Sequence, residues 1–183
     1  MAVSDKKKEI STAYLQLLAD NQEDKISVKT LIEKCGISRQ TFYYHFKDTL
    51  DVVEYTLRSI IAADVKKCCR LEDPKQAIRF LLESMEKSRS LIRKMESSSR
   101  NKEVERFVTG EIYNAMNEIL EKLPSNIDEI RQSDRQFALL FFSYGILGFV
   151  IDAIGRGVPL DIDKLSDQVY RLYMGEFRIL NID

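Results

Sequence analysis

The side chains best suited to chemistry in this sequence lie in one short stretch, residues 39–47. Arginine can pair bidentately with guanine, glutamine can pair in the same way with adenine, and threonine offers a hydroxyl and a methyl group to thymine. Arg39, Gln40 and Thr41 supply these three types in succession. The chemistry that they predict is recognition of base edges in duplex DNA.

Other side chains around this stretch suit the phosphate backbone of DNA better than the bases. Contacts to phosphate fix the position of a protein on the duplex without reading its sequence. Tyr43, His45 and Lys47 fit that role, and Lys29 is a further phosphate candidate. The complete predicted DNA-binding set is Lys29, Ser38, Arg39, Gln40, Thr41, Tyr43, Tyr44, His45 and Lys47.

Two short helices joined by a tight turn would position these side chains. Ser27 and Ser38 are predicted N-caps, because a serine hydroxyl accepts a backbone N–H of the first helical turn. Gly36 ends the first helix, since glycine adopts a left-handed conformation without a Cβ penalty. Phe42 and Phe46 share one face of the second helix, which leaves the opposite face open. A helix-turn-helix places such a helix in the major groove, but a generic surface helix packed on two others would show the same pattern.

The run GISRQTFYYHFKD, residues 36–48, resembles the recognition-helix signature of the TetR family of bacterial transcription regulators. That signature is Gly, an aliphatic residue, Ser, two variable positions, Thr, an apolar residue, Tyr, a variable position, His or Tyr, Phe and a charged turn. The preceding ISVKTLIEKC also fits. Thr49 departs from the pattern, because many members carry a phosphate-contacting lysine there. Beyond residue 70 the layout is most similar to regulators of dihydroxyacetone kinase operons.

The resemblance implies an all-α regulator, repressor or activator, that binds a double-stranded, palindromic DNA operator as a homodimer. It also implies that a small-molecule effector or a protein partner binds the C-terminal half. A low content of proline and glycine, three and seven residues, independently points to a largely helical chain. We therefore expect a helix-turn-helix DNA-binding domain at residues 1–48, a connector helix at 49–70, and a helical effector-binding and dimerisation domain at 71–183.

Hydrophobic periodicity predicts the remaining helices. The first of them, residues 5–19, should pack behind the two motif helices and complete a three-helix unit. Its Lys6, Lys7 and Lys8 are either a solvated tail or further phosphate contacts. The other predicted helices cover residues 49–70, 73–95, 102–123, 134–155 and 161–178, with loops at 21–25 and 123–133.

Residues 134–155 are apolar nearly all round. A membrane span needs about 20 apolar residues, and this run is shorter and bounded by Asp134 and Arg156, so we predict a buried helix and no membrane association. Together with the last helix, it could form a four-helix interface with a second copy of the chain. The alternative is that both helices are internal core of a monomer.

Aromatic and methionine side chains in the C-terminal half are the candidates for effector binding. Core packing is the simpler interpretation of each, because any helical core contains such residues at helical spacing. The candidate ligand-binding residues are Tyr113, Met116, Phe141, Phe142, Tyr144 and Phe149.

Composition argues against several function classes. His45 is the only histidine, so no histidine-based metal cluster can form. No glycine-rich phosphate loop or nucleophile elbow is present, and we predict no catalytic residue, no metal site, no cofactor and no enzyme activity. The net charge of −1 gives no overall attraction to DNA, so attraction must be local. A helical protein-interaction module or coregulator without its own small-molecule ligand remains the alternative function.

The three cysteines and the N-terminus bear on the compartment. Cys35, Cys68 and Cys69 form no spaced framework, which is typical of reduced thiols in a cytoplasmic protein. The adjacent pair Cys68 and Cys69 could also sense redox state or a soft metal. Residues 1–9 are polar and rich in lysine, and they predict no signal peptide.

Overall fold

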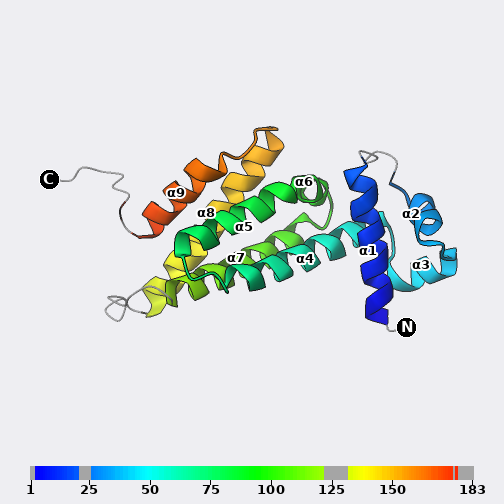
Figure 1. The fold of residues 1–183 in the computed structure, drawn as a ribbon, viewed down its shortest axis with the longest axis horizontal. Helices are drawn as coiled ribbons and strands as arrows, with labels where there is room; N and C mark the ends of the chain where they lie inside the picture. Colours follow the sequence, from blue (N-terminus) through cyan, green and yellow to red (C-terminus); the bar gives the residue numbers. More distant parts are fainter. Residues whose placement is uncertain (1–2, 21–25, 122–131, 175, 177–183) are drawn as a thin grey trace. The chain divides into compact units, whose positions relative to one another are not determined.

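The computed structural model describes residues 3–20, 26–121, 132–174 and 176. All regular secondary structure in these ranges is α-helical, so the predicted all-α class is confirmed (Figure 1). The predicted loop at residues 21–25, and residues 123–131 of the second one, lie outside the described residues. The helices are α1 (Val3–Ala19), α2 (Val28–Cys35), α3 (Arg39–His45), α4 (Thr49–Cys68), α5 (Pro74–Lys87), α6 (Arg89–Glu96), α7 (Asn101–Glu121), α8 (Gln132–Gly155) and α9 (Ile162–Tyr173).

The helices form two compact units, residues 1–59 and residues 60–183. Helix α4 contributes its first half to one unit and its second half to the other. The two units are therefore joined covalently through α4.

The first unit is the three-helix arrangement expected from the sequence, with α1 packed on α2 and α3. Ile10 and Tyr14 of α1 are fully buried, as are Leu31 of α2 and Phe42 of α3. The buried hydroxyls of Ser11 and Thr56 lie 2.9 Å apart and join α1 to α4. The core thus holds the two motif helices against a third helix.

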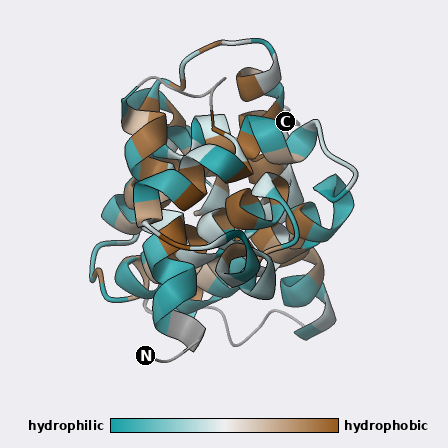
Figure 2. Ribbon diagram, turned by 90° about the vertical axis from the view of Figure 1, so that its right-hand side faces the viewer, coloured by the Kyte–Doolittle hydropathy of each residue, from teal (hydrophilic) through white to brown (hydrophobic). Residues whose placement is uncertain are grey.

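The second unit is built from two packed pairs, α7 with α8 and α5 with α9, and α6 also packs on α8. Apolar and polar residues alternate around its helices, as amphipathic packing requires (Figure 2). Lys75 and Asp167 join α5 to α9 with an ion pair of 2.6 Å, and Arg79 pairs with Asp163 one turn away. The hydrogen bond from Lys75 lowers the pKa of the Asp167 carboxyl.

The prediction of one continuous helix over residues 73–95 is wrong. The chain breaks at Ser88, which caps the end of α5 and the beginning of α6. The Ser88 side chain makes no capping hydrogen bond to α6, and the two segments pack on different partners, α5 on α9 and α6 on α8. The apolar stripe runs on across Ser88, so periodicity did not reveal the break.

Helix α8 is less buried than its composition predicted. Leu139, Ile146, Leu147 and Val150 lie in the core, whereas Phe137 is 71 % exposed. In the described part of the chain, α8 is the one helix long and apolar enough to cross a membrane, and 39 % of its most apolar stretch is buried. Helix α8 therefore has two apolar faces. One packs in the core of the second unit, and the other is exposed to solvent.

Candidate nucleic-acid interface

Local hydrogen bonds define both helices of the predicted motif. The backbone N–H of Thr30 donates to Ser27 Oγ at 3.2 Å, and the N–H of Thr41 donates to Ser38 Oγ at 3.0 Å. Gly36 has φ +60° and its N–H donates to carbonyl groups of α2. Ser27 and Gly36 fix where α2 begins and ends, and Ser38 fixes where α3 begins.

Helix α3 is amphipathic in the way its sequence indicated. Phe42 is fully buried and Phe46 nearly so, and their ring centroids are 6.1 Å apart. Arg39 and Gln40 are exposed, and Tyr44 is 73 % exposed. The face turned to solvent therefore carries the side-chain types that read base edges.

Two members of the predicted set also have a structural role. The hydroxyls of Ser38 and Thr41 lie 2.8 Å apart, and Ser38 caps α3. Thr41 is half-buried, so less of it faces solvent than of Arg39 and Gln40. If these hydroxyls contact a base or a phosphate, they must also keep their role in the N-cap of α3.

His45 and Tyr43 lie near the end of α3 and differ in accessibility. Tyr43 is 54 % exposed. The Nδ1 atom of His45 is buried and has no hydrogen-bond partner among the described residues, and the ring meets Tyr44 edge-on at 4.9 Å. A phosphate contact by His45 would therefore use its Nε2 edge.

The two lysines of the predicted set are exposed. Lys29 Nζ lies 3.9 Å from Glu33 Oε1, with both side chains largely in solvent. Such exposed pairs are weak, so this contact leaves Lys29 able to reach a phosphate. Lys47 is exposed directly after α3.

Two hydrogen bonds that the sequence did not predict join α3 to α4. The N–H of Lys47 donates to Asp51 Oδ2 at 2.9 Å, and the N–H of Asp51 donates to Asp48 Oδ1 at 2.7 Å. This reciprocal arrangement is close to a capping box, which the spacing of Asp48 and Asp51 could have revealed. It fixes the turn after the recognition helix, next to the position of Thr49.

In the second unit, the structure brings together three of the six candidate effector-binding residues. Phe141, Phe142 and Phe149 line a pocket between α5, α8 and α9. Met116 is fully buried in α7, and its carbonyl accepts a hydrogen bond of 2.6 Å from Tyr173. The remaining candidates, Tyr113 and Tyr144, are not among the residues that line this pocket. The prediction missed the lining residues contributed by α5 and α9, which are Leu82, Leu165, Gln168, Val169 and Leu172.

A comparison with known families identifies the second half of the chain. A TetR-family profile, described as a transcriptional regulator C-terminal region, matches residues 72–175. This range is more than half of the sequence. The chain belongs to the TetR family. Its function class is therefore transcriptional regulation, and residues 72–175 correspond to the C-terminal regulatory domain of such a regulator.

Solved structures of other regulators share this fold. The dihydroxyacetone kinase operon activator DhaS superposes with a TM-score of 0.72, at 19 % identity, covering 95 % of this chain and 97 % of that chain. A regulator of the TetR/AcrR family from Thermobifida fusca YX-ER1 gives 0.56 at 18 % identity, with 95 % and 99 % covered. The fatty acid degradation regulator FadR from Bacillus halodurans gives 0.53 at 17 % identity, with 94 % and 96 % covered.

The similarity to DhaS agrees with the layout expected from the sequence beyond residue 70. No curated protein sequence matches this chain. The family profile and the solved structures describe transcription regulators rather than enzymes.

Proposed function

We propose that this TetR-family chain binds a double-stranded, palindromic DNA operator through α3. The observation that carries the proposal is the exposed face of α3, where Gln40 and Tyr44 lie opposite the buried Phe42 and Phe46 and Arg39 is exposed at the flank. Lys29 and Lys47 are exposed nearby in the sequence and would contact phosphates. Base contacts would set the sequence preference, and phosphate contacts would set position and salt dependence.

Operator affinity is controlled by a small-molecule effector or a partner protein that binds residues 71–183. The match of this region to a regulatory C-terminal profile supports the proposal. Residues 1–48 read DNA and residues 49–70 connect the two functions. The alternative is a coregulator without its own small-molecule ligand, which would use the same helices to bind another protein.

The chain acts as a homodimer through α8 and α9. Phe137, Leu140 and Tyr144 are exposed on α8, and a second copy would remove this apolar surface from water. Covering α8 in this way accounts for its apolar composition without a membrane, and it suits a cytoplasmic regulator. Dimerisation would also present two recognition helices to the two halves of a palindrome.

A salt-dependent gel-shift assay with the DNA upstream of the chain's own coding sequence tests the proposal. Arg39→Ala or Gln40→Ala should lower affinity for the preferred site by about 1–3 kcal/mol and relax base preference, because a bidentate contact is lost. Lys29→Ala or Lys47→Ala should weaken binding to all duplexes similarly and reduce the salt slope by about 0.9 per contact.

Lys102→Ala is the matched control, since Lys102 is an exposed lysine on α7. It should leave both the affinity and the salt slope unchanged. If the arginine, glutamine and lysine variants all behave alike across operator variants, the assigned roles are wrong. An absence of salt-dependent binding to any duplex would favour the coregulator function.

A further inference from the structure

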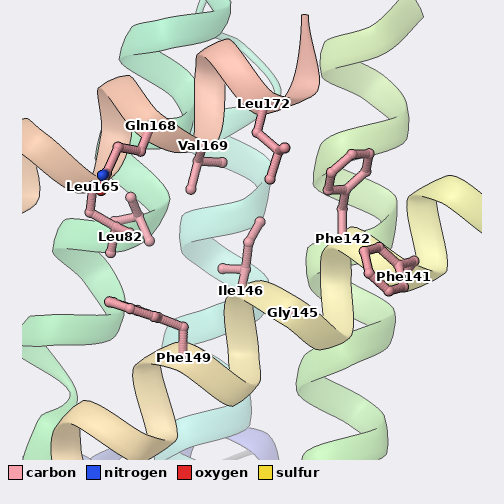
Figure 3. A pocket seen from close by; sticks show the side chains of 10 residues that line it. All are labelled: Leu82, Phe141, Phe142, Gly145, Ile146, Phe149, Leu165, Gln168, Val169 and Leu172. Atoms are coloured by element: carbon pink, nitrogen blue, oxygen red, sulfur yellow. The ribbon is translucent and has the colours of Figure 1, made fainter. Parts of the chain in front are cut away.

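Cys68 and Cys69 are adjacent thiols at the end of α4. Cys68 is the last residue of the helix and is fully buried, whereas Cys69 is half-buried in the turn that follows. Both are in the thiol form. None of the residues that line the pocket between α5, α8 and α9 is a cysteine (Figure 3). The dithiol is therefore a separate feature of the second unit.

The backbone places one thiol in the core and the other near solvent. The Cys69 N–H donates to the carbonyl of Val65 at 2.9 Å, and the Leu71 N–H donates to the carbonyl of Cys68 at 3.0 Å. Cys68 Sγ donates to the carbonyl of Ala77 in α5 at 3.3 Å. Helix ends fray and open at a lower free-energy cost than helix interiors. Opening of this one turn is therefore enough to expose Cys68.

The spacing of the pair disfavours a disulfide between the two thiols. Consecutive Cα atoms across a trans peptide are about 3.8 Å apart, and ordinary disulfides need a Cα separation of about 4.4–6.8 Å. An atom inserted between the two sulfurs relaxes this restriction. Two bonds of about 2.3 Å, the length of a metal–thiolate bond, then replace one bond of about 2.05 Å. The pair therefore suits bridging by a single thiophilic atom.

The number of thiols restricts which atom can bridge them. Thiolates are soft ligands and select soft ions. A structural zinc site takes four protein ligands, but this pair supplies two, and the third cysteine, Cys35, belongs to the other unit. An arsenic(III) centre needs only three ligands. A monosubstituted arsenical brings one of them as its own organic group, so two thiols complete its coordination.

We propose that Cys68 and Cys69 form a dithiol site that captures a monosubstituted trivalent arsenical. This inference goes beyond operator binding and does not depend on it. The half-buried Cys69 reacts first, and opening of the last turn brings Cys68 to the same arsenic atom. With phenylarsine oxide, two As–S bonds form, and the oxide oxygen leaves as water with the two thiol protons. Arsenic stays trivalent, so no oxidant or reductant takes part.

Capture changes the contact between α4 and α5. Cys68 Sγ loses its proton to the reaction and can no longer donate to the carbonyl of Ala77. The hydrogen bond from Ser84 of α5 to Asp64 of α4 does not involve either thiol. The reaction therefore acts on one end of the contact between α5 and the helix that both units share.

Mass spectrometry of the reduced full-length chain, treated with one equivalent of phenylarsine oxide, tests the site. Each chain should gain one phenylarsenic group and lose two hydrogen atoms. Titration of the remaining thiols under denaturing conditions should find one of the three cysteines unreacted. The dithiol 2,3-dimercaptopropanol should remove the group, whereas 2-mercaptoethanol at the same thiol concentration should leave it bound, because two linked bonds hold it.

Cys69→Ser and Cys68→Ala should each raise the dissociation constant for phenylarsine oxide by about 100-fold or more, because a single As–S bond lacks the gain from linkage. Cys69 is half-buried, so Cys69→Ser should fold and keeps the test decisive if Cys68→Ala does not. Cys35→Ser is the matched control and should leave capture unchanged. Burial raises the pKa of the Cys35 thiol, and Glu9 raises it further, which lowers its reactivity.

Four results would overturn the inference. They are absence of stoichiometric capture by the wild type, wild-type affinity in Cys69→Ser, loss of capture in Cys35→Ser, and an adduct that links two chains. Each is read without DNA. A chain that captures the arsenical but shifts no operator therefore contradicts only the proposed function, and the reverse result contradicts only the dithiol site.

Discussion

The three consecutive lysines of α1 occupy three different environments. Lys6 pairs with Glu9 at 2.6 Å. Lys7 Nζ lies over the rings of Phe46 and Tyr55, 5.4 and 5.6 Å from their centroids. Lys8 is exposed. The sequence grouped them as one run, but their charges are not equally available to DNA.

Lys7 links three helices at the end of the recognition helix. Phe46 caps α3 and its ring meets Tyr55 of α4 at 5.6 Å, so the ammonium of Lys7 joins α1 to both. Lys7→Met should keep the apolar stem but lose a cation–π interaction of about 0.5–1 kcal/mol. We expect lower thermal stability and altered base preference, with the salt slope of DNA binding unchanged.

Lys8→Met is the matched comparison, and it should reduce the salt slope by about 0.9 if Lys8 contacts a phosphate. Lys7→Arg should restore base preference, because arginine also interacts favourably with aromatic faces. Equal flattening of the salt slope by Lys7→Met and Lys8→Met would mean that Lys7 contacts phosphate and does not position α3.

At the scale of elements, α5 contacts α4 on one side and lines the pocket with α8 and α9 on another. Its Leu82 lines the pocket, while its Ser84 donates a hydrogen bond of 2.5 Å to Asp64 of α4. Cys68 of α4 also donates to the carbonyl of Ala77 at 3.3 Å. Because α4 continues into the first unit, these contacts join α5 to the helix that both units share.

Ser84→Ala should therefore reduce the effect of a bound effector on operator affinity. An effector changes DNA affinity only through a difference in its binding to two states of the protein, with a coupling typically of about 1–3 kcal/mol. We expect the variant to bind the effector and the operator separately as the wild type does, with weaker coupling between them. Operator titrations with and without the effector measure this.

Ser166→Ala provides the control for Ser84→Ala. Ser166 is also buried, but its hydroxyl donates to the carbonyl of Asp163 within its own helix, at 3.1 Å. Its loss should leave the coupling intact. Identical coupling in the wild type and in Ser84→Ala would show that the contact with Asp64 does not transmit the signal.

For the whole molecule, the exposed stripe of α8 determines the oligomeric state in our proposal. Phe137 and Phe141 are 71 % and 65 % exposed, and their rings stack at 6.2 Å. In an isologous dimer interface, the same surface of each copy meets its counterpart. An acidic residue introduced into this stripe would therefore be buried near the same acidic residue of the second copy. A single acidic substitution is thus introduced twice in each dimer.

Phe137→Glu should convert the dimer into a monomer and weaken binding to a palindromic operator more than binding to a single half-site. The two recognition helices of a dimer must match half-sites one turn, about 34–36 Å, or a multiple of that apart. Light scattering and operator titration measure the two effects. Gln136→Glu, which adds the same charge at the neighbouring exposed position, should leave the dimer intact, and a wild-type monomer at micromolar concentration would refute the dimer.

The sequence by itself determined the local architecture of the helix-turn-helix unit. Ser27, Gly36 and Ser38 were identified from residue type, because caps and left-handed turns depend on hydrogen bonds only a few residues long. Phe42 and Phe46 were placed in the core from helical periodicity alone. The TetR family was likewise evident from residues 36–48, where these local requirements and the exposed recognition side chains coincide.

Only the tertiary structure decided which apolar residues of the second unit face one another. Leu82 and Leu172 are ninety positions apart in the sequence and line one pocket, while Met116, of the same apolar character, fills the core. The break at Ser88 and the roles of Lys7 and Ser84 were equally hidden. Periodicity reports that a helix has an apolar face, but the partner of that face depends on how distant helices pack, which no local pattern encodes.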